Sequence, residues 1–80
     1  MSMIVTFLDY KEFEKLRSLH ADSCRYFHAG FGLGRNVTHV MKVEDEIYLE
    51  LSPIADESYA GVSQEVKSKE VEKEIEALIG

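Results

Sequence analysis

An abrupt change of pattern at Asp9 divides the start of the chain into a strand and a helix. The residues before it, Ser2–Leu8, are mostly apolar, β-branched or aromatic, which is typical of a strand. Asp9 is a preferred helix N-cap, and Glu12 stands three residues later in the reciprocal arrangement of a capping box. A helix is therefore predicted to begin at Tyr10.

This helix is expected to continue to about residue 29. At about 100° per residue, the apolar side chains between residues 10 and 27 fall on one side of the helix and the charged ones on the other. Gly30 is suited to the C′ position behind it. The alternative is a break near Ala21-Asp22-Ser23, with Cys24–Phe27 extended instead.

Two further apolar segments, Val37–Val43 and Ile47–Leu51, are predicted to pair as a hairpin. A three-residue loop at 44–46 places Val43 opposite Ile47 and gathers the apolar side chains on one face. A two-residue loop would set Val43 against an acid and disperse that face, so the three-residue loop is preferred. The predicted face comprises Val37, Met41, Val43, Ile47, Leu49 and Leu51.

The last segment, roughly 63–79, is rich in helix formers and carries an apolar stripe that includes Val71 and Ile75. The order β-α-β-β-α predicts an α+β single domain over residues 1–80. Its expected form is a two-layer sandwich, a three-stranded mixed sheet with both helices on one face. The other face would stay open, and Val40 and Tyr48 on it would form an apolar patch suited to homodimerisation.

Charge is distributed unevenly along the chain. Residues 1–43 carry six basic and four acidic side chains, a net of +2, whereas residues 44–80 carry three basic and eleven acidic ones, a net of −8. The sum of −6 argues against direct binding to nucleic acid or to an anionic membrane. The acids recur at a hairpin tip, a loop and the last helix: Glu44, Asp45, Glu46, Asp56, Glu57, Glu70, Glu72, Glu74 and Glu76.

Cysteine content and the N-terminal residues indicate a cytoplasmic setting. Cys24 is the only cysteine, so the chain cannot be held together by an internal disulfide. The apolar run at residues 2–8 is too short for the hydrophobic region of a signal peptide or for a membrane span.

A metal site is the main chemical alternative. On one long helix, His20, Cys24 and His28 would be spaced i, i+4, i+8 along one stripe, and His39, or an acid such as Asp22, could complete a set of zinc or copper ligands. Eight residues of helix rise about 12 Å, however, so the two end residues of the stripe cannot both reach one ion. Buried structural roles are favoured for all of them, and neither a metal, a cofactor nor a catalytic residue is predicted.

The glycine-rich segment Gly30–Gly34 could form an anion-binding nest with Arg35. Phosphate loops, however, usually lead from a strand into a helix, whereas this one is predicted to lead from a helix into a strand. The glycines are therefore interpreted as a chain reversal, and Phe31 within the segment as a contact residue.

Three functions remain open at this point. The preferred one is a small, acidic, non-enzymatic protein-binding module, such as an inhibitor or an antitoxin-like protein that engages the basic, nucleic-acid-binding surface of another protein. The second is a metal- or small-ligand-binding protein built on the histidines and Cys24. The third is a structural subunit of a homo-oligomer.

Overall fold

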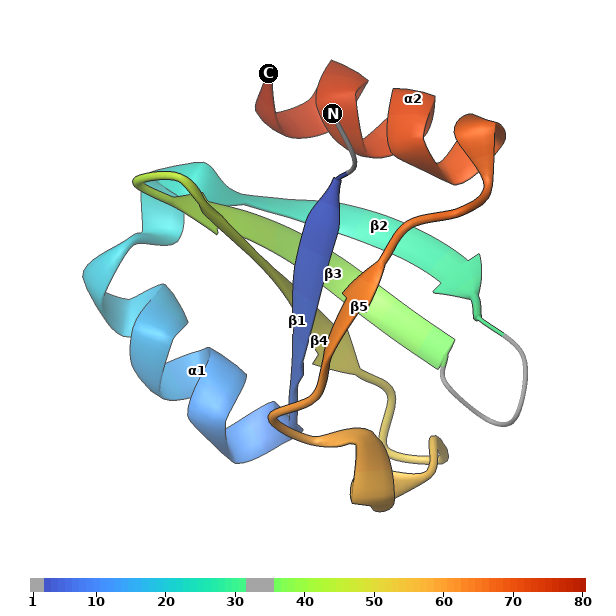
Figure 1. Ribbon diagram of the computed structural model, residues 1–80. Helices are drawn as coiled ribbons and strands as arrows, with labels where there is room; N and C mark the ends of the chain where they lie inside the picture. Colours follow the sequence, from blue (N-terminus) through green and yellow to red (C-terminus); the bar gives the residue numbers. More distant parts are fainter. Residues whose placement is uncertain (1–2, 32–35) are drawn as a thin grey trace.

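The structure, a computed structural model, describes residues 3–31 and 36–80. Within these two ranges the chain forms two α-helices and five strands (Figure 1). The strands are β1 (Ile4–Leu8), β2 (Cys24–Gly30), β3 (Asn36–Val43), β4 (Glu46–Leu51) and β5 (Ser63–Glu65), and the helices are α1 (Tyr10–Leu19) and α2 (Lys69–Ile79). Two short 3₁₀ helices lie in the connections, η1 (Ala21–Ser23) between α1 and β2 and η2 (Glu57–Tyr59) between β4 and β5. The predicted α+β class is confirmed.

All five strands form one mixed sheet in the order β2-β3-β4-β1-β5. The N-terminal strand β1 lies inside the sheet, parallel to β4 and antiparallel to β5. The predicted three-stranded sheet is therefore two strands short. The missing strands are β2, which was predicted as helix, and β5, which was predicted as the first turn of the last helix.

The helices lie on opposite faces of this sheet, so the prediction that both cover one face is wrong. Side chains alternate along a strand, and Leu49 and Glu50 of β4 therefore point to opposite faces. Leu49 belongs to the buried cluster that also contains Ile75 of α2. Glu50 contacts His39, whose ring lies against Phe13 of α1. Figure 1 shows the resulting three layers, with α2 above the sheet and α1 below it.

The first helix begins as predicted and ends ten residues earlier than predicted. The Asp9 carboxylate accepts a hydrogen bond from the Glu12 amide at 2.8 Å, and the helix ends at Leu19. The alternative break at residues 21–23 is confirmed, and residues 24–30 form β2. Extended, this segment pairs with β3 and buries Phe27, and this tertiary gain outweighs a helical periodicity that the aromatic residues Tyr26 and Phe27 support poorly.

The hairpin adopts the two-residue turn, and the predicted register is wrong by one residue on β4. Val43 pairs with Glu46, and Val40 pairs with Leu49. Glu44 in the turn takes a positive φ of 56°, which two-residue hairpin turns require. Because helices cover both faces of the sheet, apolar side chains on either face are buried. The longer loop was preferred on the assumption that only one face of the hairpin is buried, and this assumption is wrong.

The open apolar sheet face predicted for homodimerisation is absent from the described part of the chain. Val40 is fully buried on the α2 side, whereas Tyr48 pairs with Met41 and lies half-buried on the α1 side. Phe31 is also half-buried, and its ring packs edge-on against Phe7 with ring centroids 5.3 Å apart. Val40 is thus a core residue and the other two are half-buried, so the three residues do not form a shared contact patch.

The last helix begins at Lys69 and not near residue 63 as predicted. Ser68 caps it by accepting a hydrogen bond from the Val71 amide. The preceding residues instead form β5, and Val66 behind β5 is buried in the core. The predicted stripe is confirmed within α2, where Ile75 is fully buried and Val71, Leu78 and Ile79 pack against the same core.

Candidate functional site

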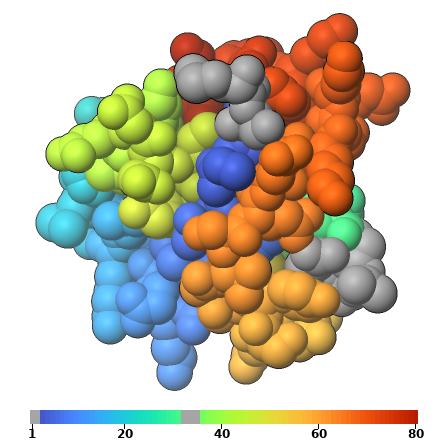
Figure 2. All heavy atoms as spheres, viewed as in Figure 1, coloured from blue at the N-terminus to red at the C-terminus, as the bar shows by residue number. Residues whose placement is uncertain are grey.

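An acidic groove lies where the hairpin tip, the start of β1 and the flank of α2 meet. It has a volume of about 530 Å³. Its acidic residues come from two elements far apart in sequence, Asp45 and Glu46 from the hairpin and Glu72 and Glu76 from α2. Met3, Ile4 and Ile47 supply its apolar surface. Figure 2 shows the yellow-green hairpin beside the dark blue start of β1 on one face of the molecule, with the red helix at the top.

The geometry of the groove follows from local rules. The hairpin turn projects Asp45 beyond the sheet at the end where β1 begins, because β4 and β1 run parallel from that end. Glu72 and Glu76 are one turn apart on α2 and therefore share a flank of the helix. Met3 and Ile47 are half-buried against the core on the α2 side, so the groove offers an apolar surface between two acidic walls.

The other predicted acidic residues do not join the groove. Glu70 and Glu74 are exposed on α2 and do not line it, and Glu44 lines a separate hollow beside Arg25 and Lys42. The predicted acidic surface is thus divided into several parts, of which the hairpin and one flank of α2 form the largest.

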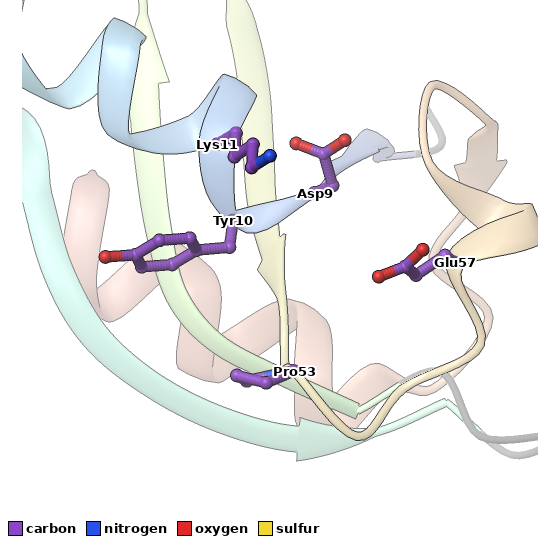
Figure 3. A pocket seen from close by; sticks show the side chains of 5 residues that line it. All are labelled: Asp9, Tyr10, Lys11, Pro53 and Glu57. Carbon is purple, nitrogen blue, oxygen red and sulfur yellow. The ribbon is translucent and has the colours of Figure 1, made fainter.

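Asp56 and Glu57 follow β4 at the opposite end of the sheet. Glu57 lines a hollow of about 380 Å³ together with Asp9, Tyr10, Lys11 and Pro53. In Figure 3 the Glu57 carboxylate points into this space, and the Lys11 amino group points towards Asp9. A cation therefore stands among the acids that line this hollow, whereas no described lysine or arginine lines the groove itself, although Lys69 and Lys73 flank Glu72 and Glu76 on the adjoining surface of α2.

Asp56 has a structural role in the η2 turn. Its carboxylate accepts a hydrogen bond from the Ser58 amide at 2.9 Å, and the hydrogen bonds from Ser58 lower the pKa of this carboxyl. The stabilisation is present above the pKa of Asp56 in the unfolded chain and is lost as the pH falls through the lower folded value. The turn thus explains Asp56 without a binding partner.

A buried polar cluster beneath α1 was not identified from the sequence. Glu50 is only 5% exposed, and its Oε1 accepts hydrogen bonds from Thr38 Oγ1 and His39 Nδ1, both at 2.9 Å. Glu50 Oε2 is buried and has no partner among the described residues. A register shift in β3 between Val37 and His39 explains why two consecutive residues both reach Glu50.

Aromatic rings enclose the imidazole of this cluster. Phe13 of α1 lies tilted against the His39 ring, with centroids 6.5 Å apart, and Tyr26 of β2 meets it edge-on at 5.7 Å. Tyr26 itself is 70% exposed. His39 therefore lies between α1 and the sheet with 26% of its side chain exposed. It was predicted to be buried, and it is partly buried.

The helical stripe of His20, Cys24 and His28, which was considered as an alternative metal site, is not formed. His20 ends α1, Cys24 begins β2 and His28 is exposed further along that strand, so the helical spacing that linked them is lost. Within residues 3–31 and 36–80, no group of three or more histidine, cysteine or acidic side chains is arranged to hold a metal ion. The anion-binding prediction for Gly30–Gly34 falls largely on residues 32–35, which lie outside the described residues.

Burial raises the pKa of the Cys24 thiol, and the charge of Arg17 opposes this effect only in part. We expect the pH profile of alkylation by iodoacetamide to have its midpoint at higher pH in the folded chain than in the urea-unfolded chain, since the thiolate is the nucleophile. Mass spectrometry of the modified chain across a pH series would measure both profiles. Coincident profiles would contradict the burial of this thiol.

Neither described helix is long and apolar enough to cross a membrane. No family model, no curated protein and no solved structure matches the chain.

Proposed function

We propose that the chain is a non-enzymatic protein-binding module whose acidic groove receives a basic segment of another protein. The observation that carries this proposal is the meeting of Asp45 and Glu46 with Glu72 and Glu76 around an apolar floor. A row of lysine or arginine side chains would meet opposite charge on both walls, and their aliphatic stems would cover Met3 and Ile47.

The charge of the whole chain supports the same class of partner. Its net charge of −6 steers cationic surfaces towards it and repels nucleic acid. A protein surface that binds phosphates through lysine and arginine would be attracted by the same field, and occupation of that surface would exclude its nucleic acid. This is the action of an inhibitor or an antitoxin-like protein, and it needs no catalytic group.

The α2 helix offers a matched pair of variants to test the groove. Glu72→Gln/Glu76→Gln removes two charges from the groove, and Glu70→Gln/Glu74→Gln removes two charges from the same helix outside it, also at i, i+4. Net charge is equal in the two variants. A fluorescent peptide of alternating arginine and leucine, titrated at low and at high salt, serves as the probe.

We expect the groove variant to bind the peptide about three- to thirtyfold more weakly, since exposed ion pairs contribute up to about 1 kcal/mol each. The control variant should bind within about twofold of the unmodified chain, and added salt should weaken binding for all three. Equal losses in the two variants would show that binding follows net charge alone and would overturn the groove as the site.

A further inference from the structure

We infer that His39 is a reactive histidine whose Nε2 accepts a phosphoryl group, activated by the buried carboxylate of Glu50. This site is independent of the acidic groove, because it lies on the α1 side of the sheet and shares no residue with the groove. The inference begins with the unusual burial of Glu50, a glutamate that is 5% exposed and has one oxygen without a partner.

The hydrogen bonds of Glu50 fix the tautomer of His39. An ionised carboxylate can only accept, so the Nδ1 atom that lies 2.9 Å from Glu50 Oε1 must carry a proton. In the neutral ring, Nε2 then has a free lone pair. Thr38 donates to the same Oε1 and holds the carboxylate in place. No hydrogen bond joins Nε2 to any described residue.

The ring is also accessible. The His39 side chain is 26% exposed, whereas that of Glu50 is 6% exposed, and the Nδ1 edge faces the buried carboxylate. Nε2 lies on the edge of the ring that does not face this carboxylate. Phe13 and Tyr26 fix the ring plane, so the lone pair has a set direction.

Neighbouring charge favours a phosphoryl group as the electrophile. Arg17 lies four residues after Phe13 and therefore on the same side of α1, and its charge reaches Cys24, which precedes Tyr26 in β2. A guanidinium is a group suited to binding phosphoryl oxygens, and Arg17 is the cation that α1 carries on the Phe13 side. Arg17 now pairs with Glu14 at 3.5 Å in a partly exposed contact, which a phosphoryl group can displace.

The transfer step balances with a phosphoramidate as donor. The Nε2 lone pair forms a bond to phosphorus as the P–N bond of the zwitterionic donor (⁺H₃N–PO₃) breaks, and the departing nitrogen, which already carries three protons, keeps that electron pair and leaves as ammonia. The ring gains a positive charge, which the Glu50 carboxylate stabilises through the Nδ1 proton. Any phosphorylated nitrogen base or acyl phosphate could supply the group in the same way.

Two measurements test this inference on the full chain. Long-range ¹H–¹⁵N NMR reads the tautomer of each neutral histidine, and we expect Nδ1–H for His39. Incubation with phosphoramidate, followed by mass spectrometry and peptide mapping under alkaline conditions, reads the site of phosphorylation. His20 and His28 are internal controls, because neither has a carboxylate hydrogen bond in the structure.

The variant His20→Gln/His28→Gln, which keeps His39 as its only histidine, should be phosphorylated at the unmodified rate. Glu50→Gln keeps the size of the side chain, and we expect it to slow the reaction about ten- to a hundredfold, as loss of a carboxylate behind a functional histidine commonly does. Glu14→Gln, which frees Arg17, should raise the rate. An Nε2–H tautomer, phosphorylation at His20 or His28 in preference to His39, or an unchanged rate in a folded Glu50→Gln chain would each overturn the inference.

Discussion

Replacing Phe7 by alanine is expected to lower the free energy of unfolding by about 3–5 kcal/mol. Phe7 is fully buried in β1, the strand that joins β4 to β5, and its ring packs against Phe31. Loss of the ring would leave a cavity on the α2 side that neighbouring strands cannot close. Urea denaturation followed by circular dichroism would measure the change, and it is large for a domain of 80 residues.

Ile4→Ala is the matched control in the same strand. Ile4 points away from the α2 core and is 53% exposed, so its truncation should cost less than about 1 kcal/mol. Similar losses for the two variants would contradict the assignment of the β1 faces.

Replacing His39 by alanine is expected to lower the free energy of unfolding by about 3 kcal/mol, since among the described residues it leaves the buried carboxylate of Glu50 with only Thr38 as a hydrogen-bond partner. Loss of the contact between the His39 ring and Phe13 adds to this effect. Urea denaturation of the variant at neutral pH measures the change.

A double variant separates the charge effect from lost packing. Glu50→Gln in the His39→Ala background removes the unpaired charge, so the double variant should be more stable than His39→Ala alone. If the second substitution instead destabilises the chain further, then the buried carboxylate is not the cause of the loss.

The sequence predicted elements best where the local signal is chemically specific. The capping box at Asp9 placed the start of α1 correctly, and the apolar stripe of Val71 and Ile75 identified the buried side of α2. Both signals depend on residues a few positions apart, so they do not require knowledge of the rest of the fold.

Elements that depend on distant pairing were predicted less well. Residues 24–30 carry both a helical and a strand pattern, and only their pairing with β3 settles the choice. Ser63–Glu65 is too short and too polar to indicate a strand, and it is fixed by β1. The hairpin register failed because the prediction assumed that a single sheet face is covered.

The candidate sites show the same contrast between local signals and long-range pairing. The acidic residues of the groove were identified from charge alone, but which of them meet depends on the parallel pairing of β1 with β4. The Thr38–His39–Glu50 cluster was missed because it requires the correct register and an irregularity in β3. A glutamate within an otherwise apolar strand was the one available signal.

The central position of the first strand affects how the chain reaches its native state. Both neighbours of β1 come from distant sequence, and Thr6 is paired with Ser63. The β2-β3-β4 meander can form from local contacts, whereas insertion of β1 between β4 and β5 must close loops that span most of the chain. Such non-local pairing slows folding, so we expect this small domain to fold in milliseconds to seconds and not in microseconds. During synthesis, the N-terminal strand would remain without a parallel partner until β4 has left the ribosome.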